Sequence, residues 1–161
     1  MTLYNFKDEL RHGQDGEARL DKFFEGLGFA IQPANRDEER QGIDRWFTNG
    51  EGDRRSVQYK TDFMSQDTGN LAAEIISVDR PLAAGWAFTT TAAWIAYYRY
   101  VVGDILWIPT AAMQARLADW IVTYKCKPTQ NKRYRTINVY PPVAEWEAIA
   151  VAKWRAEVTL D

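Results

Sequence analysis

Residues 43–63 read IDRWFTNGEGDRRSVQYKTDF, and they decide how the rest of the chain is interpreted. Apolar and polar residues alternate at 43–47 and again at 56–63, with a run rich in Gly, Asn and Asp between them. Alternation with a period of two is typical of half-buried strands, and Asn-Gly and Gly-Asp are turn signals. The stretch therefore predicts a β-hairpin.

The register of this hairpin follows from its loop. Pairing Asp44 with Gln58 would pair Phe47 with Arg55 and leave residues 48–54 as the connection. Those are the turn-forming residues, so we expect this register.

Three polar side chains then meet at one end of the hairpin. Successive side chains of a strand point to opposite faces, so Gln58 and Lys60 share a face and Asp44 lies across from them. Carboxylate and amide oxygens are ligands suited to Mg²⁺, which is usually completed by water and substrate phosphate. A bound metal can activate water and neutralise charge on a phosphodiester, and the ammonium of Lys60 could stabilise the transition state. The trio therefore predicts phosphodiester hydrolysis.

The elements around the hairpin predict a mixed α/β domain. Leu20, Phe23, Phe24 and Leu27 recur at helical spacing. Pro109 precedes a second predicted helix, and Pro141 and Pro142 open the last one. The predicted elements are a helix at 16–29, strands at 30–34, 43–47 and 56–63, a strand or short helix at 71–78, a helix at 89–100, a strand at 104–110, a helix after 110, a strand at 135–140 and a C-terminal helix.

The pattern GIDRWF…SVQYKTD resembles the PD-(D/E)XK, or restriction-endonuclease-like, nuclease superfamily, in which an Asp begins one strand and (D/E/Q)-x-K lies on the next. The resemblance covers about residues 12–110 and leaves 111–161 as a C-terminal extension of a single domain. It implies an αβββαβ core with a mixed central sheet flanked by helices. Asp44 and Gln58 would bind Mg²⁺ or Mn²⁺, and Lys60 would serve the water or the scissile phosphate. Ile43 stands where the family often has Pro, and Gln58 replaces the more usual acid.

The family often has a Glu on the helix before the sheet, and Glu17 matches this place as a catalytic and metal-binding residue. Glu17 extends the apolar stripe of its helix toward the sheet. An acid in a first helical turn is also favourable without any catalytic role. Of the other candidates, Asp62 is expected in a structural ion pair, Glu74 would approach the site if 71–78 is a strand, and His12 is expected on the surface.

The segment YKCKPTQNKRYR (124–135) is basic and contains no acid. Its cations suit contact with a phosphate backbone, and its tyrosines could stack on exposed bases, although a solvated basic loop has the same composition. The candidate nucleic-acid-binding residues are Lys125, Lys127, Lys132, Arg133 and Arg135.

The bulk composition limits the alternatives. With 161 residues, 46% of them apolar and 26% charged, the chain suits one globular domain. The first twenty residues lack the apolar core of a signal peptide, and no apolar stretch is long enough to span a membrane. Cys126 is the single cysteine, so an internal disulfide and a structural zinc site are excluded, and a cytoplasmic location is expected. The net charge of −2 argues against coating nucleic acid through bulk charge, but not against DNA contact on one face.

The leading interpretation is a metal-dependent nuclease acting on DNA, of a phage or mobile-element repair, recombination or resolvase type. A homodimer stays open, because cutting both strands needs two sites. The alternatives are a catalytically inactive DNA-binding protein that keeps the nuclease fold, and a module that binds a protein partner through aromatic surface.

Overall fold

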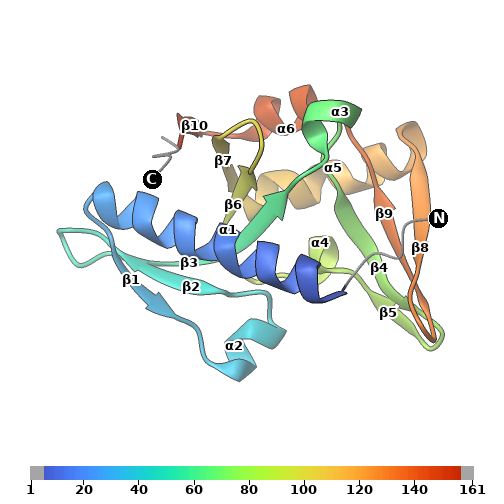
Figure 1. Ribbon diagram of the computed structural model, residues 1–161, viewed down its shortest axis with the longest axis horizontal. Helices are drawn as coiled ribbons and strands as arrows, with labels where there is room; N and C mark the ends of the chain where they lie inside the picture. Colours follow the sequence, from blue (N-terminus) through green and yellow to red (C-terminus); the bar gives the residue numbers. More distant parts are fainter. Residues whose placement is uncertain (1–5, 157–161) are drawn as a thin grey trace.

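The computed structural model describes residues 6–156, with side chains from Leu10 onward, and it is a mixed α/β structure with helices on both sides of a mixed sheet (Figure 1). This coarse fold class was predicted from the sequence. The elements are α1 (Phe6–Gly26), β1 (Ala30–Pro33), α2 (Arg36–Arg40), β2 (Arg45–Thr48), β3 (Arg54–Asp62), α3 (Ser65–Thr68), β4 (Ala73–Asp79), β5 (Leu82–Ala84), α4 (Trp86–Thr89), β6 (Trp94–Arg99), β7 (Asp104–Pro109), α5 (Thr110–Thr123), β8 (Cys126–Gln130), β9 (Arg135–Val139), α6 (Val143–Ile149) and β10 (Ala152–Arg155).

The larger sheet has the strand order β1-β2-β3-β6-β7-β10. Strands β3 and β6 run parallel, and the other neighbours are antiparallel. The predicted hairpin register is confirmed, because Phe47 pairs with Arg55. Pairing continues to Thr48 and Arg54, so the connection is residues 49–53 and is shorter than predicted.

The predicted helix at 89–100 is wrong. Residues 94–99 form β6, which lies between β3 and β7 near the centre of the larger sheet. The side chains of Ile95 and Tyr97 enter the apolar cluster on one face, and those of Ala96 and Tyr98 enter the cluster on the other face. A strand buried on both faces has a continuous apolar sequence, which periodicity cannot distinguish from a buried helix.

Helix α1 covers one face of the larger sheet. Leu20 and Phe24 are fully buried there against β2, β3, β6 and β7. The helix begins at Phe6, well before the predicted start, and ends at Gly26. Leu27, which was expected on its buried stripe, is 49% exposed because it lies beyond the helix end.

Helices α5 and α6 and the second sheet cover the opposite face. The large side chains of Trp120 and Trp146 are completely buried in this cluster. The second sheet has the order β5-β4-β9-β8 and is antiparallel throughout. Its strand β4 settles the predicted ambiguity at 71–78 in favour of a strand. The buried Tyr97 hydroxyl donates to the carbonyl of Ala72 at 2.8 Å, which ties β6 to the start of β4.

No helix within residues 6–156 is both long and apolar enough to cross a membrane.

Candidate functional site

Asp44 lies directly before β2 and is fixed against β3 by two hydrogen bonds. Its backbone N–H donates to the carbonyl of Val57 at 2.9 Å, and its Oδ2 accepts from the backbone N–H of Tyr59 at 2.7 Å. The predicted register therefore brings the Asp44 carboxylate beside the part of β3 that carries Gln58 and Lys60.

Lys60 is enclosed by groups from several elements. Its Nζ lies 4.7 Å from the centre of the Trp86 ring, within cation–π distance. Burial lowers the pKa of Lys60, and the negative charges of Asp44, Glu74 and Glu17 oppose that change. An ammonium surrounded in this way is held in place before any ligand arrives.

The Asp44 carboxyl has a raised pKa. The main cause is burial, and the negative charge of Glu17 adds to it. The hydrogen bond from Tyr59 and the charge of Lys60 act in the opposite direction. Ionisation of Asp44 is therefore less favourable here than in water.

Gln58 is only 4% exposed, and its Oε1 is buried without a hydrogen-bond partner among the described residues. A buried amide oxygen without a partner is costly for folding. A buried acceptor without a partner is available to a ligand.

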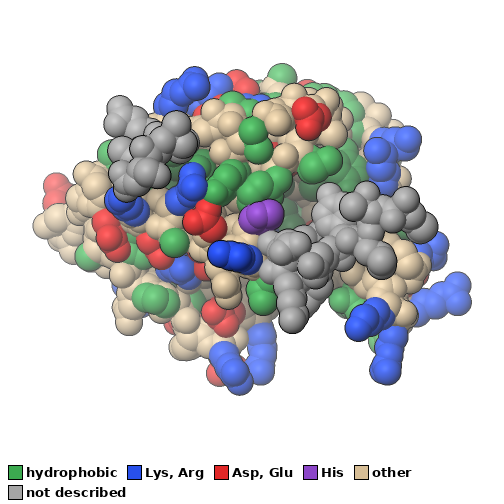
Figure 2. Space-filling model, in the orientation of Figure 1, with side chains coloured by type: hydrophobic (Ala, Val, Ile, Leu, Met, Phe, Trp, Pro, Cys, Tyr) green, Lys and Arg blue, Asp and Glu red, His purple; other side chains and the backbone are tan. Residues whose placement is uncertain are grey.

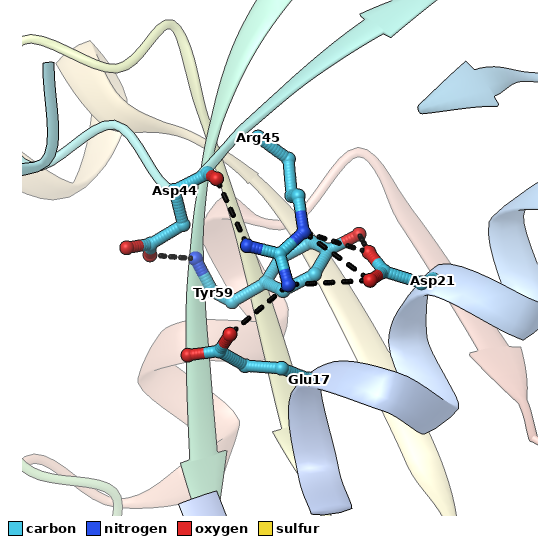
Figure 3. A network of polar contacts seen from close by, with 5 residues as sticks. All are labelled: Glu17, Asp21, Asp44, Arg45 and Tyr59. Atoms are coloured by element: carbon cyan, nitrogen blue, oxygen red, sulfur yellow. Dashed lines mark hydrogen bonds and ion pairs between the residues drawn. The ribbon is translucent and has the colours of Figure 1, made fainter. Parts of the chain in front are cut away.

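Glu17 reaches the site from α1, which lies on the other face of β3. Its Oε2 accepts from Arg45 Nη2 at 3.0 Å, and its charge acts on both Asp44 and Lys60. Figure 3 shows the Arg45 guanidinium between Glu17 and Asp21, with the carboxylates of Glu17 and Asp44 pointing to the same side. The structure thus brings Glu17 near the predicted trio, although in an ion pair.

The close approach of α1 to β3 depends on Gly16. A Cβ atom at this position would lie 2.8 Å from the Thr61 Cγ2 methyl and would overlap the hydroxyl more severely. Only glycine fits this contact without a shift, and the contact brings Glu17 to the strand.

Three residues of this region were not identified from the sequence as members of the site. Arg45 Nε donates to Asp21 at 3.0 Å, and the Tyr59 hydroxyl donates to Asp21 at 2.9 Å. The Arg45 guanidinium lies over the Tyr59 ring, 5.2 Å from its centre. The sequence does place Arg45 and Tyr59 on one face of the hairpin, and Asp21 one helical turn after Glu17. Their contacts with one another depend on how α1 packs on the sheet, which the sequence does not show.

Glu74 approaches Lys60 from the second sheet, as expected if residues 71–78 formed a strand. Its Oε1 accepts from the backbone N–H of Trp86 at 3.4 Å. Gly85 packs so closely on the backbone of Glu74 that a Cβ there would overlap it. These contacts bring a carboxylate and an aromatic ring to Lys60 together.

Two other expectations have different outcomes. Asp62 accepts from the backbone N–H groups of Met64 and Ser65 at 3.3 and 2.9 Å, so it orders the start of α3. The expected ion pair does not form with any side chain from Leu10 to Ala156. His12 is exposed, as expected, and its ring packs in a tilted arrangement on Phe63, with 5.2 Å between the ring centres.

A Mg²⁺ ion at this site would need oxygen ligands from the surrounding side chains. Within the described side chains, no three Asp, Glu, His or Cys residues lie close enough together to form a metal site by themselves. Magnesium is often held by one or two carboxylates, with water and phosphate completing the shell. The Asp44 carboxylate and the unpartnered Gln58 oxygen fit that chemistry.

The predicted nucleic-acid-binding residues lie on the β8–β9 hairpin, at the edge of the second sheet. All five are exposed: Lys125, Lys127, Lys132, Arg133 and Arg135. Arg135 is paired with Asp79, with Nε 2.8 Å from Oδ2. Lys127 lies 5.5 Å from the centre of the Tyr140 ring. The hairpin is therefore accessible, and it lies apart from Asp44, Gln58 and Lys60 on the larger sheet.

Comparisons of this chain with protein-family models, with curated proteins and with solved structures find no match.

Proposed function

We propose that this protein is a Mg²⁺-dependent nuclease that hydrolyses DNA phosphodiester bonds, with a core like that of the PD-(D/E)XK nucleases. The observation that carries the proposal is the placement of Asp44, Gln58 and Lys60 at one end of the β2–β3 hairpin. The Gln58 oxygen is buried there without a partner among the described residues, and the charge of Asp44 acts on Lys60.

The order of elements supports the nuclease-like core. Helix α1 is followed by the antiparallel strands β1, β2 and β3, and β6 then joins β3 in parallel after the short helix α4. With the short helices α2 and α3 and the strands β4 and β5 left aside, this order of elements is compatible with αβββαβ. The connection from β3 to β6 also contains β4 and β5, which form part of the second sheet and carry Glu74 toward Lys60.

The charge balance supports a divalent cation. Four carboxylates surround the two cations Lys60 and Arg45, namely Glu17, Asp21, Asp44 and Glu74. Fully ionised, the group has a formal charge of −2. An excess of partly buried negative charge is unfavourable, and a divalent cation would balance it.

Asp44 and Gln58 would hold the metal, and Glu17 is a third ligand if it turns from Arg45. When bound, Mg²⁺ or Mn²⁺ supplies an activated water and neutralises charge on the phosphate. The ammonium of Lys60 would face the phosphate, and the Trp86 ring keeps it in place. The hydrogen bond from Tyr59 holds Asp44 at the strand.

A cleavage assay tests this proposal. Supercoiled plasmid and single-stranded DNA are incubated with Mg²⁺ or Mn²⁺ and wild type, Asp44→Ala or Lys60→Ala. The exposed substitutions Asp53→Ala and Lys22→Ala serve as matched controls. We expect cleavage by wild type and both controls, and a loss of about 100-fold or more in the two site variants. Cleavage that survives both site substitutions would contradict the proposal.

A second candidate function is DNA binding without cleavage. Gln58 favours it, because a neutral amide holds a metal less strongly than the carboxylate that usually stands at this position. This alternative predicts DNA binding that persists in EDTA and no cleavage with either metal. Restoring the acid with Gln58→Glu would then be the informative variant, because gained cleavage would identify the missing ligand.

A further inference from the structure

The second sheet carries a cluster of positive charge outside the proposed active site. Its β4–β5 turn and its β8–β9 turn lie side by side (Figure 1). Arg135 joins them, because its backbone N–H and its Nε both donate to the Asp79 carboxylate at 2.8 Å. We call this unit, residues 79–84 and 125–135, the basic arm.

The charge of the basic arm is opposite to that of the rest of the chain. The arm contains six Lys or Arg residues and one acid, a formal charge of +5, while the whole chain is −2. The remainder is therefore −7. Figure 2 shows Lys and Arg side chains gathered at the end of the molecule where the second sheet lies. Arg80, on the β4–β5 turn, belongs to this cluster although it lies outside the basic segment of the sequence.

The basic arm is exposed along its length. Every residue of β5 and of β8 is exposed, so these strands bury little apolar surface. The one acid of the arm, Asp79, is already paired with Arg135. Arg80, Lys132 and Arg133 form no ion pair with the described residues. Their charges remain available to a polyanion.

The partner with the right chemistry is a nucleic acid. Regularly spaced phosphates match a row of exposed cations, and their binding releases counterions. Tyr134, which is 39% exposed on the β8–β9 turn, offers an aromatic surface to a base or a sugar.

The arm is connected to the proposed active site through β4. Glu74, whose charge acts on Lys60, is five residues before Asp79 on this strand.

We propose that the basic arm binds the phosphate backbone of the nucleic acid that the proposed active site cuts. The cut rests on the proposed nuclease function, whereas the binding of the arm to nucleic acid does not.

The test is a binding measurement in EDTA, where no metal-dependent cleavage occurs. Fluorescence anisotropy is recorded with a labelled duplex of about 25 base pairs and with one of its single strands, at several salt concentrations. The arm variant is Arg80→Gln/Lys132→Gln/Arg133→Gln. The control Lys22→Gln/Arg36→Gln/Arg55→Gln removes the same charge from exposed positions outside the arm.

We expect the arm variant to bind at least about tenfold more weakly than wild type at moderate salt. The slope of log affinity against log salt should fall by up to about 3, since each lost phosphate contact removes about 0.9. The control should stay within about twofold of wild type, and thermal melting should show that both variants are folded.

Equal binding by the arm and control variants would overturn the proposal. Binding of wild type to vesicles rich in anionic lipid, but not to DNA or RNA, would also overturn it. Arm-dependent binding without any cleavage would contradict the nuclease and leave the arm standing. If the protein cleaves DNA but the arm substitutions do not weaken binding, the proposal for the arm is contradicted and the proposed nuclease function is not.

Discussion

At the scale of single residues, the proposed site contains charges that the fold does not favour. Burial raises the pKa of Asp44 and lowers that of Lys60, so each shift disfavours the charged form. Residues selected for stability alone would avoid both changes. Their presence together is expected of a site whose missing charge comes from a ligand.

Asp44→Asn should stabilise the protein in the absence of metal. A carboxyl with a higher pKa in the folded chain than in the unfolded chain loses stability as pH rises through the interval between the two values. Wild type should show this loss of stability just above the ordinary Asp pKa. Asp44→Asn should not show it, because an amide does not titrate, and the amide oxygen can still accept the hydrogen bond from the backbone N–H of Tyr59. Thermal melting from pH 4 to pH 7 measures the difference.

The control for this substitution is Asp53→Asn, at an exposed loop position. It should leave the pH dependence of melting unchanged. An Asp44→Asn protein that melts with the wild-type pH profile would show that Asp44 is not held in an unfavourable environment.

Arg45→Met should destabilise the fold by about 2 kcal/mol, between the costs typical of exposed and buried ion pairs. The side chain is 13% exposed and is shared by two carboxylates, so its removal leaves their charges together. Denaturant unfolding measures the change. Adding Asp21→Asn to Arg45→Met should recover part of the lost stability, because one of the two carboxylates is then neutral. If the double variant is no more stable than Arg45→Met, charge repulsion is not the cause of the loss.

At the scale of secondary-structure elements, the contact between α1 and β3 is the most sensitive to substitution. Gly16→Ala should cost about 1–3 kcal/mol, because the new methyl overlaps Thr61 and overpacking has a cost of this size. It should also reduce cleavage, since Glu17 moves with the helix. The measurements are denaturant unfolding and cleavage rate.

The compensating variant separates this packing effect from helix propensity. Gly16→Ala/Thr61→Ala restores the space and should recover most of the lost stability. Alanine is a better helix former than glycine by about 1 kcal/mol, which opposes the packing cost in Gly16→Ala. If Gly16→Ala alone were as stable as wild type, α1 would be able to move away from Thr61 without cost.

The elements predicted correctly are those whose sequence carries a local signal. Strands β2 and β3 alternate apolar and polar residues around a turn, so both their existence and their register could be predicted. Strand β6 carries the opposite signal, because Ile95, Ala96, Tyr97 and Tyr98 are buried on both faces and do not alternate. Strands β8 and β10 are short edge strands whose pairing partners are set by the fold, and they were not predicted as strands.

The contacts of the candidate site also fall into those that a local signal predicts and those that depend on the packing of distant elements. Asp44, Gln58 and Lys60 were brought together by one hairpin register, which is a local property. The approach of Trp86 to Lys60 and the bond of Asp21 to Arg45 join residues 24 or more positions apart. Such contacts depend on how helices and sheets pack, and a single sequence contains no periodic signal for them.

At the scale of the whole molecule, metal binding should be coupled to folding. Millimolar Mg²⁺ should raise the melting temperature of wild type, because a ligand that binds only the folded state stabilises it. The free energy of unfolding rises by about 2.7 kcal/mol when the ligand concentration is 100 times Kd. Asp44→Ala and Gln58→Leu should remove most of this effect, and Asp53→Ala should not.

The pH dependence of that stabilisation follows from Asp44. Its raised pKa means that a proton must leave before the carboxylate can bind a cation, so the Mg²⁺-induced rise in melting temperature should grow as pH increases above the acid range. A rise in melting temperature that Ca²⁺, Mg²⁺ and NaCl at matched ionic strength produce equally, and that Asp44→Ala retains, would indicate charge screening rather than a site.

The exposed strand β8 has a consequence for self-association. It is the last strand of the second sheet within residues 6–156, so one row of its backbone N–H and C=O groups has no neighbouring strand in that part of the chain. Open edges of this kind invite pairing with another chain, and lysine and proline on the edge oppose it. Lys127 and Pro128 stand in the middle of β8. Replacing both with β-branched apolar residues should therefore turn a monodisperse preparation into one that forms sheet-like aggregates.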